Sequence, residues 1–124
     1  MTDHGIILDL PHIPWASQQL WDNDVVERGG KYYLIFCAKD KTQTFRLGVA
    51  VANRPEGPFV PQPDPIRGSY SIDPCTFKDD DGQIYVYFGG IWGGQLQRYA
   101  GNKSLAVEHL PQGCEPALPP RVAR

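Results

Sequence analysis

Short apolar runs, separated by turns rich in glycine, proline or acidic residues, make up the hydrophobic pattern of this chain. Two of these runs are aromatic: residues 31–36 follow Gly29-Gly30, and residues 83–90 follow Asp80-Asp81-Gly82. Glycine adopts the positive φ that tight turns demand, so each turn predicts a β-hairpin. We expect these hairpins over residues 24–36 and 72–88.

The two predicted hairpins resemble each other. When Gly30 is set on Gly82, Phe36 aligns with Phe88, as do the tyrosines three positions after each glycine, at an offset of 52 residues (82 minus 30). Self-similarity at about 50 residues, with several short strands in each unit, is typical of β-propeller blades. Chance similarity between two ordinary hairpins is the alternative that two copies leave open.

The rest of the chain also favours short strands. Residues 45–52 are apolar at both alternating sets of positions and predict an interior strand, while 95–100 alternate and predict another. Residues 5–10 suggest a strand, and 15–20 suggest a loop or a single helical turn. The proline-rich stretch 61–65 suggests a connection between units.

These elements predict an all-β fold of propeller blades in a single domain over residues 1–124. We expect about two four-stranded antiparallel blades, one over 21–65 and a second, incomplete one over 70–124. Because a closed propeller needs 4–8 blades, and unpaired strand edges invite pairing, we expect self-association into a homo-oligomer.

Charge and composition exclude several classes of function. The formal net charge is −2, which gives no basic field for nucleic acid or an anionic membrane. No apolar run approaches the roughly 20 residues that span a bilayer, and the start shows no signal-peptide pattern, so we expect a cytoplasmic protein. The cysteines, Cys37, Cys75 and Cys114, are widely spaced and predict free buried thiols. We expect no metal and no cofactor.

Candidate chemistry gathers at the starts of the two hairpins. Asp24 and Asp73 occupy matching places at the start of strands that would line a propeller channel. Paired carboxylates are what glycoside hydrolysis uses, about 6.5–9.5 Å apart in inverting enzymes. The alternative for each aspartate is a hydrogen-bonded residue that only fixes the start of its strand.

Three tryptophans, Trp15, Trp21 and Trp92, lie in predicted loops beside this channel. Aromatic faces pack against the apolar faces of sugars, so Trp21 and Trp92 are candidate substrate-binding residues. Ordinary core or inter-blade packing is the alternative for each.

Several short motifs run in one order along the chain: 21–24 (Trp-Asp-Asn-Asp), 30–34, 48–52, 56–59, 71–74 (Ser-Ile-Asp-Pro), 79–82 and 88–96. Together they resemble glycoside hydrolase family 43, the five-bladed β-propeller glycosidases of β-xylosidase and α-L-arabinofuranosidase type. The resemblance implies hydrolysis of O-glycosidic bonds in xylan- or arabinan-type oligosaccharides with inversion, and it implies a xylo- or arabino-oligosaccharide as ligand.

The family uses three acidic residues, and the resemblance carries over only one of them. Asp73 matches the aspartate that tunes the pKa of the general acid and orients the sugar. No Asp-Pro motif of the base type precedes Trp21, and neither Glu108 nor Glu115 has the context of the acid. The resemblance therefore implies an interior piece of such an enzyme, about its second and third blades, that lacks the base and the acid.

Three interpretations follow from the sequence. The first is a glycosidase of this family whose isolated chain is not a competent hydrolase. The second is a non-catalytic carbohydrate-binding or structural half-propeller that oligomerises. The third is a truncated product with no function of its own.

Overall fold

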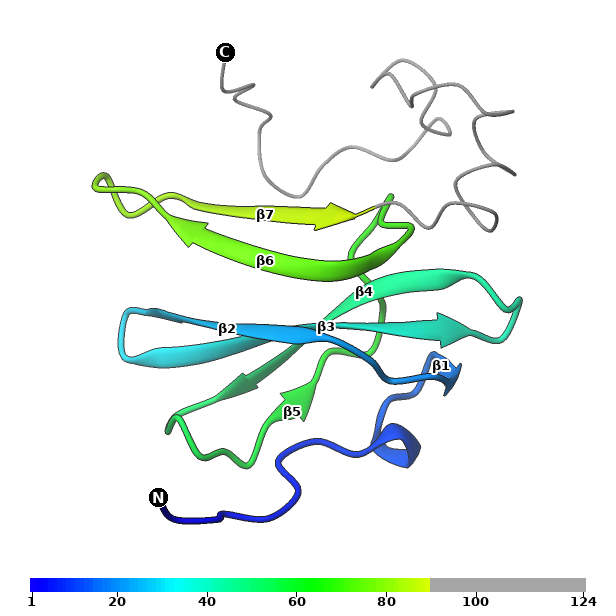
Figure 1. The fold of residues 1–124 in the computed structure, drawn as a ribbon, viewed down its shortest axis with the longest axis horizontal. Helices are drawn as coiled ribbons and strands as arrows, with labels where there is room; N and C mark the ends of the chain where they lie inside the picture. The colour runs from blue at the N-terminus through cyan, green and yellow to red at the C-terminus, as the bar shows by residue number, and fades with distance from the viewer. Residues whose placement is uncertain (90–124) are drawn as a thin grey trace.

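The computed structural model of the chain describes residues 1–89 (Figure 1). The predicted strand over 95–100, Trp92 and Cys114 lie outside the described residues. Within them, short antiparallel strands carry the fold, as the pattern predicts. The described elements are η1 (Leu10–His12), β1 (Ala16–Gln18), β2 (Asn23–Arg28), β3 (Lys31–Asp40), β4 (Phe45–Ala52), β5 (Val60–Pro61), β6 (Ile72–Lys78) and β7 (Ile84–Gly89).

The first sheet is built around the long strand β3. β2 pairs with the first part of β3, and β1 pairs with its end, so the two short strands share one edge. β4 and β5 follow on the other side, all antiparallel. Gly29 and Gly30 both take positive φ (62° and 76°), as the two-residue turn between β2 and β3 requires. The first predicted hairpin is confirmed, and the strand predicted over 45–52 is β4.

The second sheet is the antiparallel pair β6–β7, which confirms the second predicted hairpin. Its turn closes when the Gly82 N–H donates to the Asp79 carbonyl (2.9 Å) and the Asp79 N–H donates to the Gln83 carbonyl (2.8 Å). Gly82 has φ of 80°, which explains the glycine at this position. The pairing shifts register between Ile72 and Cys75, where β6 bulges.

The N-terminal segment differs from the prediction. Residues 5–10 form no strand; Asp9 instead caps the 3-10 turn η1 by accepting from the Leu10 N–H (2.8 Å). Ile7 and Leu8 pack against the first sheet, so burial rather than strand pairing explains their apolar character. The loop or single helical turn suggested over 15–20 is also wrong for residues 16–18, which pair with β3 as strand β1.

Two apolar clusters cover the two faces of the first sheet. One joins residues of β3 and β4 to Ile13 and Trp15, and the Trp15 ring stacks on Phe36 (5.8 Å between centroids, 6° between planes). The other comprises Cys37, Phe45 and Leu47, against which Ile72 of β6 and Val86 of β7 pack. The β6–β7 hairpin therefore lies over the second face of the first sheet, as Figure 1 shows.

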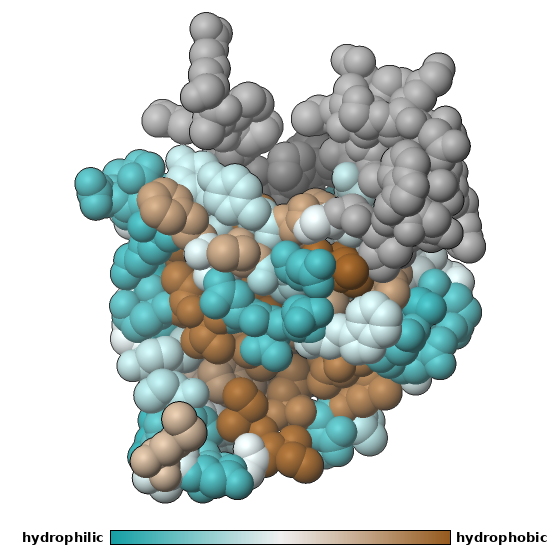
Figure 2. Space-filling view, in the orientation of Figure 1, coloured by the Kyte–Doolittle hydropathy of each residue, from teal (hydrophilic) through white to brown (hydrophobic). Residues whose placement is uncertain are grey.

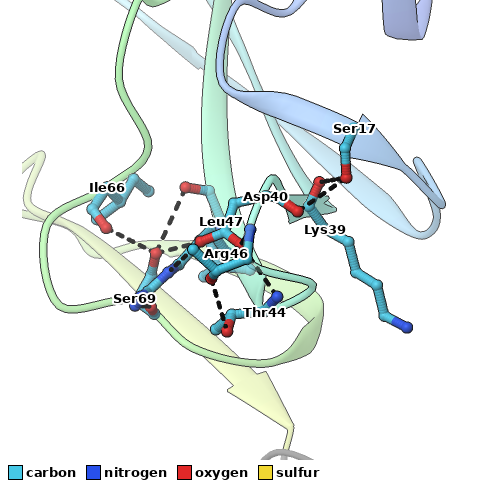
Figure 3. A network of polar contacts seen from close by, with 9 residues as sticks. Ser17, Lys39, Asp40, Thr44, Arg46, Leu47, Ile66 and Ser69 are labelled. Atoms are coloured by element: carbon cyan, nitrogen blue, oxygen red, sulfur yellow. Dashed lines mark hydrogen bonds and ion pairs between the residues drawn. The ribbon is translucent and has the colours of Figure 1, made fainter.

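A polar network holds the connection that leads into β6 (Figure 3). The Ser69 hydroxyl donates to the Ile66 carbonyl (2.6 Å) and accepts from the Leu47 N–H (3.0 Å). The Arg46 guanidinium donates to the Ser69 carbonyl (2.7 Å) and pairs with the Asp40 carboxylate (3.3 Å). Asp40 also closes the β3–β4 turn, so one network ties that turn to the start of the second hairpin.

On the face shown in Figure 2, hydrophobic residues gather toward the middle, and hydrophilic ones lie at both sides and across part of it. Some of the large exposed residues lie on the second hairpin: Phe77 is 53% exposed and Tyr87 is 54% exposed. In residues 1–89 the one helix is the three-residue turn η1, and no helix there is long and apolar enough to cross a membrane.

Candidate functional site

The candidate site lies where β2 and β6 run side by side. Three pairs of residues connect the segment that contains β2 with β6: Asp22 with Asp73, Asp24 with Thr76, and Glu27 with Lys78. The residue numbers rise together along both strands, so β2 and β6 are parallel and both begin at the same end. Asp24 and Asp73 are each the second residue of their strand, in the matching places that the sequence predicts.

Asp24 serves as a clamp between the two hairpins. Its Oδ2 accepts from the Thr76 N–H (2.7 Å) and the Thr76 hydroxyl (2.6 Å), and its Oδ1 accepts from the Val25 N–H (2.9 Å). Partial burial alone would raise the pKa of Asp24, but these hydrogen bonds more than offset that effect and lower it. This geometry corresponds to the alternative of a hydrogen-bonded residue at the start of a strand. Binding of a sugar by Asp24 stays a prediction.

A second, weaker contact lies at the other end of the strands. The Lys78 ammonium contacts the Glu27 carboxylate (3.3 Å) and donates to the Glu27 carbonyl (3.1 Å). The Gly30 N–H also donates to Glu27 (2.8 Å), and that bond, followed by the charge and hydrogen bond of Lys78, lowers the pKa of Glu27. Both side chains are exposed, so this ion pair adds little to stability.

Asp73 stands at the bulge of β6 with its carboxylate exposed. Its backbone is left-handed (φ 56°), a conformation that aspartate tolerates better than most residues with a side chain. A Cβ at Gly89 would lie 3.7 Å from the Asp73 Oδ2, an ordinary contact distance, so Gly89 stands directly beside this carboxylate. Local desolvation, and then the hydrogen bond and negative charge of Asp22, raise the pKa of Asp73.

Asp22 is a residue that the sequence reasoning missed. It directly follows Trp21, and its carboxyl group is, after desolvation, the cause that raises the pKa of Asp73, through hydrogen bonding and negative charge. The signal was present as a second acid two positions before Asp24 in the 21–24 motif, but the partner is 51 residues away (73 minus 22). Only the parallel placement of β2 and β6 brings the two acids together.

Cys37 lies beneath this pair. It is fully buried, its N–H donates to the Asp22 carbonyl (3.3 Å), and its thiol donates to the same oxygen (3.6 Å). Burial raises the pKa of the Cys37 thiol, consistent with the predicted buried thiol. The same prediction is wrong for Cys75, which is exposed because it lies on the face of β6 that points away from the first sheet.

The tryptophans have different environments. Trp21 is 43% exposed and its ring lies tilted on Phe45 (4.8 Å, 41°), so one part of the ring is packed and another faces solvent. Trp15 is buried in the core, as the packing alternative states. Trp21 stays a candidate sugar-binding residue, and so does Trp92, which lies outside the described residues. Within residues 1–89 no group of three His, Cys, Asp or Glu side chains could hold a metal ion.

Two antiparallel units joined face to face, with their first strands parallel, define part of a β-propeller, and the solved structures that this chain resembles are β-propellers. Acidic side chains collect at the shared start of those first strands. The chain belongs to the glycosyl hydrolases family 43, whose family model matches residues 2–112.

Three of the curated relatives are named as a β-xylosidase or as xylosidase/arabinosidases. The chain is 70% identical to a β-xylosidase of Xylanibacter ruminicola over 98% of its own length, and 57% identical to a xylosidase/arabinosidase of Bacteroides ovatus over 100%. It spans 38% of the length of each of these curated relatives.

Solved structures agree with this assignment. A β-xylosidase/α-arabinofuranosidase from a compost metagenome, in complex with xylotriose, is 64% identical with a TM-score of 0.75, over 79% of this chain and 30% of that one. A Xanthomonas citri family 43 enzyme complexed with xylotriose is 53% identical with a TM-score of 0.75, over 88% of this chain and 33% of that one.

Proposed function

We propose that this chain forms part of the sugar-cleaving channel of a family 43 β-xylosidase/α-L-arabinofuranosidase and contributes Asp73 as the carboxylate that tunes the general acid. The observation that carries the proposal is the exposed Asp73 carboxylate at the shared start of β2 and β6, in a chain 70% identical to a β-xylosidase. Trp21, at the same end, is partly exposed and is the candidate aromatic contact for a xylo- or arabino-oligosaccharide.

The isolated chain should bind sugar without cleaving it. Inversion needs one carboxyl group to protonate the leaving oxygen and another to activate water on the opposite face of the sugar. Asp73 supplies neither step in this family, and no residue of this chain matches the base or the acid. Asp73 instead places negative charge beside the acid, which raises the pKa of that acid and keeps its proton available.

The test combines turnover and binding. Purified chain, Asp73→Asn and the control Asp80→Asn, which removes a charge from the β6–β7 turn, are incubated with aryl β-xyloside and aryl α-L-arabinofuranoside. Xylotriose binding is measured by calorimetry. We expect no turnover in any of them, and binding that Asp73→Asn weakens while Asp80→Asn leaves it unchanged. Turnover that disappears in Asp73→Asn would contradict the expectation that the isolated chain cleaves no sugar. Absence of xylotriose binding by the unchanged chain would contradict the proposal that it forms part of a sugar-binding channel.

A second candidate function is a non-catalytic half-propeller that self-associates. Its support is the outward face of β6–β7. Thr76 and Val86 point toward the first sheet, so by strand alternation Phe77 and Tyr87 point away from it, and both are more than half exposed. Propeller blades pack face to face, and a second copy of this chain offers a surface of matching character.

Light scattering after gel filtration tests this candidate. We expect the unchanged chain to run as a homo-oligomer, and Tyr87→Lys to shift it toward the monomer because the new charge would be buried in the interface. Val60→Lys, which alters an exposed position on β5, serves as the control. A monomer at all concentrations in the unchanged chain would count against self-association.

A further inference from the structure

Asp73 stands in a stretch of β6 that the pairing of its own sheet does not hold. In the part of the chain that the structure describes, β6 pairs with β7 from Lys78 back to Cys75 and then skips to Ile72. The two bulge residues between them, Asp73 and Pro74, therefore have no paired residue on β7. Proline also has no N–H to donate. The position of this bulge must depend on contacts beyond the β6–β7 ladder.

The backbone of Asp73 also needs support. Its φ of 56° lies in the left-handed region, which a residue with a side chain enters at some cost in free energy. Such a conformation persists only where the surrounding structure enforces it, and it is often found at functional sites. Whatever holds this bulge in place also determines where the exposed Asp73 carboxylate points.

Two contacts with the first sheet hold the bulge, one on each side of it. Before the bulge, the Ile72 side chain packs against the second apolar cluster of the first sheet. After the bulge, both polar groups of Thr76 donate to the Oδ2 of Asp24, the N–H at 2.7 Å and the hydroxyl at 2.6 Å. Only four positions separate these two anchors (76 minus 72), so little freedom is left between them.

Asp24 is itself firmly held. It lies on β2 opposite Ile35 of the long central strand β3. Its other oxygen accepts from the Val25 N–H (2.9 Å), so three hydrogen bonds orient the carboxylate. Hydrogen bonds to a charged acceptor are shorter and stronger than those to a neutral one. A carboxylate fixed in this way is a rigid support for β6.

We propose that Asp24 is a positioning residue for Asp73. By holding Thr76, it keeps the β6 bulge in the conformation that directs the Asp73 carboxylate outward at the shared start of β2 and β6. The inference rests on the proposed function, in which Asp73 tunes the general acid. It gives Asp24 a part in the site without contact to the sugar, and so it differs from the direct sugar binding that the sequence predicts.

NMR of the full chain without sugar tests the position of Asp73. Three-bond couplings and the Cα chemical shift of Asp73 report its φ, and in the unchanged chain they should show the left-handed conformation. Asp24→Ala should move both toward extended values, and Thr76→Val, which keeps one of the two bonds, should move them part of the way. The conservative variant Thr76→Ser retains the N–H and the hydroxyl, so it should keep the values of the unchanged chain.

The control is Gly48→Ala, which disturbs the other face of the first sheet, beside Phe36 and Trp15. A loss of global stability alone does not change φ in the folded state, so this variant should keep the Asp73 signals. Thr76→Val leaves the Asp24 carboxylate in place and decides the matter if Asp24→Ala does not fold. Asp73 signals that are insensitive to the Asp24 and Thr76 variants, or that move equally in Gly48→Ala, would overturn the inference.

Xylotriose calorimetry adds the functional readout. Asp24→Ala should weaken binding about tenfold, the size of one lost hydrogen bond to a charged group. Adding Asp24→Ala to Asp73→Asn should cause no further loss, because Asp24 acts through Asp73. Additive losses would mean that Asp24 contacts the sugar directly, contrary to the inference. Absence of binding by the unchanged chain would contradict the proposed function instead, and the NMR comparison would still decide whether Asp24 holds the bulge.

Discussion

The two hairpins begin with the same local pattern and end in different environments. Phe36 on β3 has none of its surface exposed, whereas Phe88, its aligned counterpart on β7, is 40% exposed. β3 has strands on both sides and apolar clusters on both faces, while β7 pairs only with β6 in the part of the chain that the structure describes. The comparison teaches that the repeated sequence specifies a hairpin, but the number of neighbours sets how much each hairpin contributes to stability.

The sharpest test exchanges the paired phenylalanines for alanine. Phe36→Ala should cost about 3–5 kcal/mol of unfolding free energy, since it opens a cavity beside the Trp15 ring. Phe88→Ala should cost about 1 kcal/mol, because the ring is half-exposed and loses mainly its edge contact with Tyr70. Urea denaturation followed by circular dichroism measures both. Equal losses would contradict the contrast between the hairpins.

A pair of glycines extends the comparison. A Cβ at Gly48 on β4 would lie 2.3 Å from the Phe36 ring and 2.6 Å from the Trp15 ring, both in the packed core. Gly48→Ala should therefore cost about 1–3 kcal/mol through overpacking. Gly89→Ala meets nothing closer than 3.7 Å and should change the denaturation midpoint little. A neutral Gly48→Ala would show that this core is looser than its contacts indicate.

The clamp between the hairpins gives an effect of intermediate size. Asp24→Asn should cost about 1–2 kcal/mol at neutral pH, because the hydrogen bonds from Thr76 lose their charged acceptor. Folding lowers the pKa of Asp24, so its contribution is complete above the ordinary value of 3.8 and is lost as the pH falls through the lower folded value. Urea titrations near neutral pH and at about pH 3 should show the difference shrinking in acid.

The matched partner variant is Thr76→Val, which keeps the shape of the side chain and removes the hydroxyl. A double-mutant cycle with Asp24→Asn should give a coupling that favours the pair. If the changes in unfolding free energy of the two variants simply add, the contact between Asp24 and Thr76 does not stabilise the packing of the two hairpins.

The smallest effect belongs to the exposed pair of Lys78 and Glu27. Lys78→Met should leave the urea midpoint within experimental error, since solvent screens the charges and the long side chains lose entropy when they pair. Added salt should not separate the variant from the unchanged chain. A clear loss of stability that depends on salt would mean that the Lys78–Glu27 pair contributes to the contact between β2 and β6 as much as Asp24 does.

The sequence alone determined the local elements and the family. Glycine turns marked both hairpins, the apolar stretch 45–52 marked β4, and the ordered motifs indicated the β-propeller glycosidases, because turn geometry and hydrophobic period act over a few residues. The apolar N-terminal segment was misread as a strand, since an apolar run has the same period whether it pairs or only packs.

Only the tertiary structure decided the roles of the acids. Asp24 and Asp73 looked equivalent along the chain, yet Asp24 is engaged by Thr76 while the Asp73 carboxylate faces outward beside Asp22. These contacts join residues about 50 positions apart, and they form where β2 and β6 lie side by side. Periodicity carries no information about such distant pairs, because they form only when two finished hairpins pack face to face.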